Sequence, residues 1–127
     1  MKVIGIVGSR RRDTEEDFKI VEEKFLEVYK EGDTICSGLC YMGADRFAVL
    51  LSAKYKTKTL WFPADWKKHG KSAGFIRNSD IAKRSDVLIA CVAKDRKGGT
   101  EDTVKKYLKE NKKDIYLVWV EIFVIFL

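Results

Sequence analysis

Hydrophobic and polar positions along this chain follow two alternating periods. Short apolar runs typical of buried strands recur at 2–7, 34–37, 56–62, 86–92 and 114–120. Between them, apolar residues recur at helical spacing, at about 14–30, 44–55, 72–83 and from 100 onward. The order βαβαβαβαβ predicts a parallel sheet with right-handed crossovers and helices on both faces. We therefore predict an α/β fold, a three-layer Rossmann-like sandwich around a mainly parallel five-stranded sheet.

Two stretches of the chain fit these periods less well. The segment 64–74 has neither period, is polar and carries Trp66, so we predict a loop of the kind that binds ligands in α/β proteins. The following helix, for which Ser72 is a plausible cap, is poorly amphipathic and has Arg77 and Asn78 in its middle. Such a pattern indicates either a helix face turned toward a ligand or a misplaced helix. The first helix has a clearer start, with Asp13 or Thr14 as cap and an acid three residues later.

No linker or internal repeat divides the 127 residues, so we predict one domain over 1–120. The last residues, 121–127, form an apolar tail, EIFVIFL. It could prolong the last strand, cover an apolar groove or pair across a dimer edge. We favour the dimer contact and therefore expect a homodimer.

Composition narrows the class of partner. The chain is 46% hydrophobic and 35% charged, with a net charge of +6, which favours acidic partners such as nucleotides. Lysine and glutamate are interleaved, however, so a solvated surface of mixed charge explains much of the basic excess. The sequence lacks the dense run of lysine and arginine that is typical of nucleic-acid-binding segments. No segment reaches the roughly 20 apolar residues of a membrane span. The amino terminus reads as a strand rather than a signal peptide, so we expect a cytoplasmic protein with no membrane partner.

The three cysteines indicate buried thiols in a reducing compartment. Cys36 and Cys91 lie inside apolar strand patterns, and an odd count does not suit a disulfide framework. Together with Cys40 and His69 they lack the paired spacing of zinc ligands. We expect neither a metal site nor a cofactor.

Three loops marked by glycine follow strands and should share one edge of the sheet. Ligands of open α/β sheets bind at the carboxyl ends of the strands, and helix starts there offer backbone N–H groups to phosphate. Asp45, in the first turn of its helix, either stabilises that helix or accepts a ribose hydroxyl. We expect Arg11 and Arg12 to be solvated. The three loops contain Gly8, Ser9 and Arg10; Ser37, Gly38, Gly43, Ala44 and Asp45; and Gly98, Gly99 and Thr100 (which we expect to cap the last helix).

Five short motifs, in order along the chain, resemble the YspA-like branch of the SLOG superfamily. That superfamily also contains the LOG phosphoribohydrolases and the DNA-processing protein Smf. The resemblance runs from Lys2 to about Lys113 and implies a Rossmann-like domain that binds a nucleotide or nucleotide-derived ligand. The motifs are Gly8-Ser9-Arg10, Ser37 to Asp45 (SGxxxGAD), Ala64-Asp65-Trp66, Gly70 to Gly74 leading to Arg77-Asn78, and Gly99-Thr100 after the strand that begins at Asp86.

The resemblance to the LOG enzymes is incomplete. Arg77 matches their catalytic arginine by position, but their PGGxGTxxE motif is only half present. Thr103 stands where the motif has glutamate, and Glu101 and Asp102 lie about 100–200° around the helix from that direction. This departure puts hydrolysis in doubt and leaves binding untouched.

The leading hypothesis is therefore binding or sensing of a nucleotide or nucleotide-derived ligand. The glycine loops would hold its phosphate, Arg10 and Arg77 would neutralise it, and Trp66 would stack on its base. The alternative is cleavage of the N-glycosidic bond of a nucleoside 5′-monophosphate, with Arg77 orienting the phosphate and Glu101 or Asp102 stabilising the transition state. A third reading, by analogy to Smf, is single-stranded DNA binding.

Overall fold

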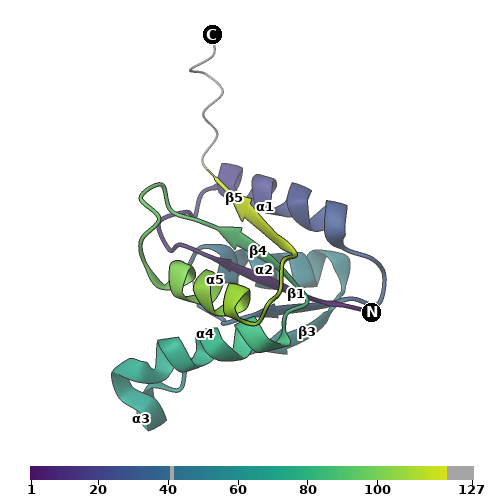
Figure 1. Cartoon of the computed structure of the whole chain (residues 1–127). Helices are drawn as coiled ribbons and strands as arrows, with labels where there is room; N and C mark the ends of the chain where they lie inside the picture. The colour runs from purple at the N-terminus through teal and green to yellow at the C-terminus, as the bar shows by residue number, and fades with distance from the viewer. Residues whose placement is uncertain (41, 120–127) are drawn as a thin grey trace.

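The computed structural model describes residues 1–40 and 42–119 as alternating strands and helices (Figure 1). The apolar tail, 121–127, and with it the predicted dimer contact, lies outside the described residues. The elements are β1 (Val3–Gly8), α1 (Glu15–Val28), β2 (Thr34–Ser37), α2 (Ala44–Tyr55), β3 (Lys58–Trp61), α3 (Trp66–His69), a 3₁₀ turn (Gly70–Ser72), α4 (Ala73–Arg84), β4 (Val87–Cys91), α5 (Gly99–Lys109) and β5 (Ile115–Val118).

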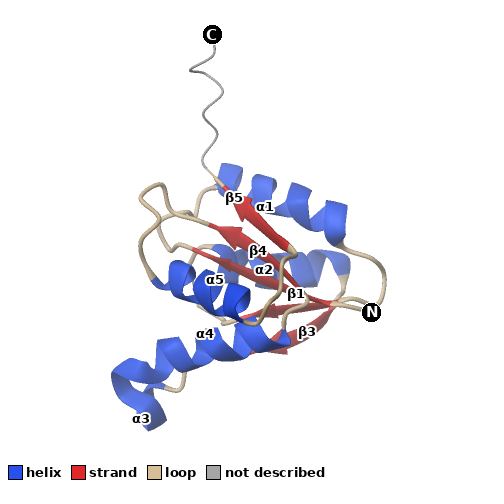
Figure 2. Cartoon of the chain, viewed as in Figure 1, coloured by secondary structure: helices blue, strands red, loops and turns tan. Residues whose placement is uncertain are grey.

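The five strands form one sheet in the order β3-β2-β1-β4-β5, and every neighbouring pair is parallel. Helices α1 and α2 cover one face of the sheet, and α4 and α5 cover the other (Figure 2). The predicted three-layer Rossmann-like sandwich is therefore confirmed. The chain leaves β1 toward β2 and β3, then returns to place β4 on the other side of β1. The order thus reverses between β1 and β4, and open α/β sheets bind ligands at such a point.

Each face of the sheet has its own apolar core. Between the sheet and α1 and α2, the largest fully buried side chains include Phe25 and Phe47. Between the sheet and α4 and α5, Tyr107 is fully buried, and its hydroxyl shares its one proton between the carbonyl oxygens of Asp86 and Asp114, which lie 2.8 and 2.9 Å away. The central strands β1 and β4 are thus enclosed on both sides, which explains their nearly continuous apolar sequences.

The start of α1 matches the sequence prediction. Thr14 is the cap residue, and its hydroxyl accepts from the Asp17 N–H while the Asp17 carboxylate accepts from the Thr14 N–H. This reciprocal pair satisfies two donors that the first turn of a helix leaves free. Asp13, the other predicted cap, is used elsewhere, as described below.

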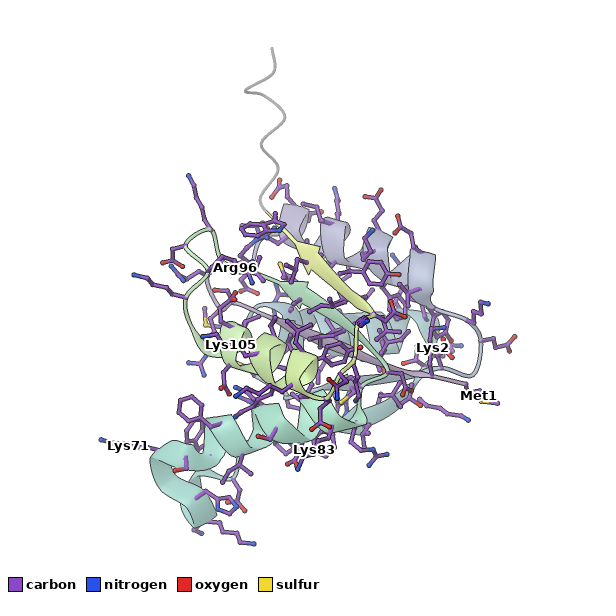
Figure 3. All side chains as sticks on the ribbon, viewed as in Figure 1. Met1, Lys2, Lys71, Lys83, Arg96 and Lys105 are labelled. Carbon is purple, nitrogen blue, oxygen red and sulfur yellow. The ribbon has the colours of Figure 1, made fainter. Side chains whose placement is uncertain are left out.

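The segment 64–74 is not the loop that its sequence predicted. Its middle forms α3 and the 3₁₀ turn, and α4 begins before the segment ends. The Asp65 carboxylate accepts from the Lys68 N–H at 3.0 Å, which starts α3, and Gly70 ends it at a φ of 57°. A helix of four residues is too short to show a helical period, so hydrophobic patterning could not reveal it. Figure 3 shows that this end of the α3–α4 unit, marked by Lys71, projects from the body of the molecule.

The cap of α5 also differs from the prediction. Gly98, and not Thr100, precedes the helix, at a φ of 118° that favours glycine. Thr100 instead lies inside the first turn with its side chain buried. The backbone at the start of α5 therefore consists of two residues without side chains, Gly98 and Gly99.

Candidate functional site

A cleft of about 300 Å³ opens at the carboxyl ends of β1 and β4, where the strand order reverses. Segments from the β1–α1 loop, α2, α4 and the start of α5 meet around it. The residues that line it are Val7, Gly8, Ser9, Arg10, Arg11, Cys40, Asp45, Arg77, Asn78, Ile81, Lys97, Gly98, Gly99, Thr100 and Thr103.

The charges that line the cleft are predominantly positive. Arg10, Arg11, Arg77 and Lys97 contribute four basic side chains, and Asp45 contributes the one carboxylate among the described lining residues. The glycine-bounded start of α5 adds the partial positive charge of a helix N-terminus. Basic groups within a concave site attract anions and concentrate the field there.

Asp45 organises the floor of the cleft. One of its carboxylate oxygens accepts from the Ser37 hydroxyl at 3.0 Å, and the other accepts from the Cys40 N–H at 3.0 Å. Burial raises the pKa of this carboxyl, partly offset by the Cys40 N–H, by Arg77 and by the Ser37 hydroxyl. Ser37 is itself fully buried, and its hydroxyl, which has a single proton to share between the two acceptors, also lies 2.6 Å from the Ile6 carbonyl oxygen. Ser37 therefore holds Asp45 in place and has no exposed atom to offer a ligand.

Arg77 reaches from α4 across to the β2–α2 loop. Its Nη1 donates to the Gly38 carbonyl oxygen at 3.1 Å and lies 4.0 Å from the Asp45 carboxylate. A Cβ at position 38 would lie 2.5 Å from Nη1, so glycine is needed for this approach. The Arg77 side chain is only 15% exposed, yet part of it lines the cleft. These contacts already restrict the Arg77 side chain, so its guanidinium loses little conformational entropy when it binds an anion in the cleft.

Asn78 connects α4 to the start of α5. Its side-chain amide donates to the Gly99 carbonyl oxygen and to the Asp102 carboxylate, both at 3.2 Å. Asp102 also forms an ion pair with Lys106 at 2.8 Å. The Asn78 side chain thus fixes the glycine turn on which α5 begins.

Gly43 brings the β2–α2 loop against the β1–α1 loop. It has a φ of 70°, and a Cβ there would lie 2.5 Å from the Ser9 carbonyl oxygen. The Gly43 N–H, which we predicted as a phosphate donor, donates to the Asp13 carboxylate at 2.7 Å. Arg46 donates to the same Asp13 oxygen at 2.9 Å. The Gly43 N–H and the Arg46 pair hold the pKa of Asp13 below its ordinary value.

Glu101 points away from the cleft. Both of its carboxylate oxygens accept from the Arg96 guanidinium at 2.7 Å, and the Arg96 guanidinium also lies 4.8 Å from the centre of the Trp119 ring. Arg96, labelled in Figure 3, has a φ of 55°, so the β4–α5 loop turns back on itself and brings the guanidinium to Glu101. Neither Glu101 nor Asp102 is among the lining residues, so the carboxylate that N-glycosidic cleavage would require at these positions is engaged elsewhere.

Trp66 lies beside the cleft rather than in it. Its side chain is 54% exposed and packs over Gly74, where a Cβ would lie 3.4 Å from the ring and 3.8 Å from the Arg77 Nη2. The ring and the guanidinium therefore approach the same point on α4. A ligand held at Arg77 would have to extend out of the cleft to stack on Trp66.

Arg11 and Arg12, which we expected to be solvated, differ from each other. Arg12 is buried, and its guanidinium donates to the carbonyl oxygens of Val92 and Val118 and to Asp17. The expectation was wrong for Arg12, because the ends of β4 and β5 leave carbonyl oxygens that this side chain satisfies. Arg11 is exposed, but it forms a two-pronged ion pair with Asp95 and lines the cleft.

Comparison with known proteins shows the fold. The structure is similar to that of the molybdenum cofactor binding protein from the phototrophic bacterium Rippkaea orientalis, with a TM-score of 0.71. The two chains share 21% sequence identity, and the match covers 94% of this chain and 77% of the other. No protein-family model matches the sequence. No curated protein matches it either.

The structure gathers most of the predicted site residues at one place. Those that line the cleft are Gly8, Ser9, Arg10, Asp45, Arg77, Asn78, Gly98, Gly99 and Thr100. Those outside the lining are Ser37, Gly38, Gly43, Ala44, Trp66 and Glu101. The second group includes residues that support the lining without being exposed in the cleft. Ala44 is fully buried, and its Cβ occupies the space that a side chain at Gly8 would need.

Sequence reasoning missed six lining residues, and helical spacing could have found two of them. Ile81 is four residues after Arg77, and Thr103 is three after Thr100, so each shares a helix face with a predicted residue. The others are Val7, Arg11, Cys40 and Lys97, which depend on loop conformation or on the end of β1.

Residues 1–40 and 42–119 contain no clustered metal ligands and no membrane-spanning helix. No group of three or more histidine, cysteine, aspartate or glutamate side chains there is placed to hold a metal ion. Within the same residues, none of the helices combines the length and apolarity that crossing a membrane requires.

Proposed function

We propose that this protein binds a nucleotide or nucleotide-derived ligand in the cleft between β1 and β4. The observation that carries the proposal is the set of four basic side chains against one carboxylate, at the edge where Rossmann-like sheets bind ligands. Such a lining suits a phosphate or pyrophosphate, which arginine binds through two parallel N–H donors. The motif resemblance to the YspA-like branch of the SLOG superfamily supports the same ligand class, and we propose membership of that branch.

Each part of the cleft has a proposed role. Arg77 and Arg10 neutralise the phosphate, and the N-terminus of α5 at Gly98 and Gly99 adds backbone donors. Asp45 takes a ribose hydroxyl through a lone pair not used by its two present donors, as carboxylates have capacity for about four. Trp66 stacks on a base that extends past Arg77. We propose that the protein acts in the cytoplasm as a homodimer.

We propose binding or sensing rather than turnover. Glycosidic cleavage in the LOG manner needs a carboxylate beside the ribose, and Glu101 is held by Arg96 outside the cleft. Single-stranded DNA binding has weaker support, since a cleft of about 300 Å³ suits a small molecule better than a strand.

The structural neighbour supplies a second candidate ligand. That protein is named as binding a molybdenum cofactor, and the two chains share their fold. A molybdenum cofactor therefore belongs in any ligand screen beside the nucleotides.

The proposal is tested by calorimetric titration with AMP, ADP-ribose, NAD and the molybdenum cofactor, followed by chromatography for released base. Saturable binding of a nucleotide without base release supports a binding or sensing role. Release of adenine would instead support the hydrolase alternative. Saturable binding of the molybdenum cofactor alone would replace the nucleotide assignment.

A further inference from the structure

The Arg11–Asp95 ion pair joins two loops beside the cleft. Arg11 follows β1, and Asp95 follows β4, the strand beside it. Nη1 and Nη2 of Arg11 donate to the two Asp95 oxygens at 2.9 and 2.7 Å, and Nη2 donates also to the Lys97 carbonyl oxygen at 3.0 Å. The Arg11 fork is therefore filled by a carboxylate of this chain.

The position of this ion pair distinguishes it from an ordinary surface pair. Arg11 and Lys97 both line the cleft, whereas Asp95 is outside the lining. Both members are exposed, with 58% of the Arg11 side chain and 46% of the Asp95 side chain accessible to water. Water screens an exposed ion pair, so an anion in the cleft can compete with the Asp95 carboxylate for the Arg11 guanidinium.

The cleft is lined by further cations. Within the described residues, Arg10 and the Lys97 ammonium make no side-chain hydrogen bond or ion pair. Arg77 reaches the cleft from a different element, α4, and lies beside Asp45. Basic groups thus enter one cleft from α4 and from the loops after β1 and β4, so a ligand with two phosphoryl groups can contact more of them than a ligand with one.

We propose that Arg11, with Lys97, forms a second anion subsite, which Asp95 fills until a ligand with two phosphoryl groups displaces it. This inference rests on the proposed function and narrows its ligand class to nucleotide derivatives that carry a diphosphate. One phosphoryl group binds at Arg77, and the other takes the place of the Asp95 carboxylate on Arg11. A monophosphate bound at Arg77 does not displace Asp95, so the Arg11–Asp95 ion pair stays formed.

Asp95→Asn is the sharpest variant for this proposal. Asparagine keeps the side-chain oxygen that accepts from the Lys97 N–H at 3.1 Å, so the turn can persist while the charge is lost. Arg11→Ala removes the subsite itself. Glu27→Gln is the matched control, because it also removes one carboxylate charge from an exposed ion pair, with Lys24 on α1.

The experiment titrates AMP, ADP and inorganic pyrophosphate into the wild type and the three variants, by calorimetry and by NMR of the arginine side-chain N–H groups. Asp95→Asn should bind ADP and pyrophosphate about fivefold more tightly, the size expected from releasing an exposed pair, and AMP nearly as the wild type does. Arg11→Ala should lose the preference for ADP over AMP, and Glu27→Gln should leave it unchanged.

Two results separate this proposal from the proposed function. Equal gains for AMP and ADP in Asp95→Asn, or an unchanged ADP preference in Arg11→Ala, would overturn the second subsite while nucleotide binding stands. If no nucleotide binds but pyrophosphate shifts the Arg11 N–H resonance, more tightly in Asp95→Asn, the subsite stands and the nucleotide assignment fails. If calorimetry detects binding of neither nucleotide nor pyrophosphate, and neither shifts that resonance, both fail.

Discussion

Gly43 lies so close to Ser9 that a Cβ on the glycine would sit 2.5 Å from the serine carbonyl oxygen. This contact locks the loop before α2 onto the loop after β1, and both loops contribute residues to the cleft. The backbone at Gly43 has a φ of 70° and a ψ of −149°, a combination that side-chain-bearing residues avoid.

Gly43→Ala should therefore destabilise the protein in two ways, by backbone strain and by collision with Ser9. Gly70→Ala is its matched control, because Gly70 has a similar backbone, with φ 57° and ψ −135°, but nothing within 4 Å of the added Cβ. Strain alone costs about 1–3 kcal/mol. We expect Gly43→Ala to cost at least about 1 kcal/mol more than Gly70→Ala in urea-induced unfolding. Equal losses would show that the collision with Ser9 is relieved without cost.

Arg12 and Arg11 should differ in their effect on stability. Arg12 is buried and satisfies two carbonyl oxygens and Asp17, so Arg12→Ala should lower the free energy of unfolding by about 3–5 kcal/mol. Arg11→Ala, at the preceding residue, removes only a solvent-exposed ion pair and should cost much less than Arg12→Ala. Chemical denaturation of both variants measures the difference. Similar losses would contradict the assignment of Arg12 as the internal support of β4 and β5.

Asp45 should give ligand binding a pH dependence. Because burial raises its pKa in the folded protein, the carboxyl takes up a proton above the pH at which an exposed aspartate would. Protonation removes the one carboxylate charge among the described lining residues, so affinity for ADP-ribose should rise as the pH falls through this raised pKa. Asp45→Asn should flatten that profile. An unchanged profile in the variant would assign the pH dependence to another group.

The pKa shifts of Asp45 and Asp95 have opposite senses. For Asp45, the stabilising effect of protonation is fully present below the unfolded-state pKa and is lost as the pH rises through the raised folded-state pKa. For Asp95, whose pKa the Arg11 hydrogen bonds lower to about 2, stability is present above the unfolded-state pKa and is lost as the pH falls toward 2. Unfolding of Asp45→Asn and Asp95→Asn across acid pH should therefore show differences from the wild type of opposite slope.

The thiols should react at different rates in the folded protein. Burial raises the pKa of Cys36 and of Cys91 to about 11, and both lie inside the sheet. Cys40 is partly exposed and lines the cleft. An alkylating reagent should modify Cys40 first, and a bound ligand should slow that reaction. Mass spectrometry of the peptides reads both, and fast modification of Cys36 would contradict the packing of β2.

Sequence patterning predicted the sheet because β1 and β4 are apolar without interruption and each is followed by glycine or a turn. It also placed Gly8, Arg10 and Thr100 at one edge, since the ends of parallel strands must meet there. It could not predict the contacts of Glu101 or Arg11, because their partners, Arg96 and Asp95, lie in the β4–α5 loop. Patterning does not predict the conformation of that loop, in which Arg96 has a positive φ. It missed α3 because four residues are too few for a period, and it misread Arg12 because burial of an arginine depends on carbonyl oxygens from distant strand ends.

The most direct test of the central claim compares Arg77→Ala with Arg84→Ala by calorimetric titration with ADP-ribose. Both variants remove one arginine from α4, but Arg84 lies in the last turn of the helix, outside the cleft. We expect Arg77→Ala to weaken binding at least tenfold, the loss of roughly one charge-assisted hydrogen bond of about 1.5–3 kcal/mol, while Arg84→Ala binds as the wild type does. Equal affinity in all three proteins would contradict an anion site at this cleft.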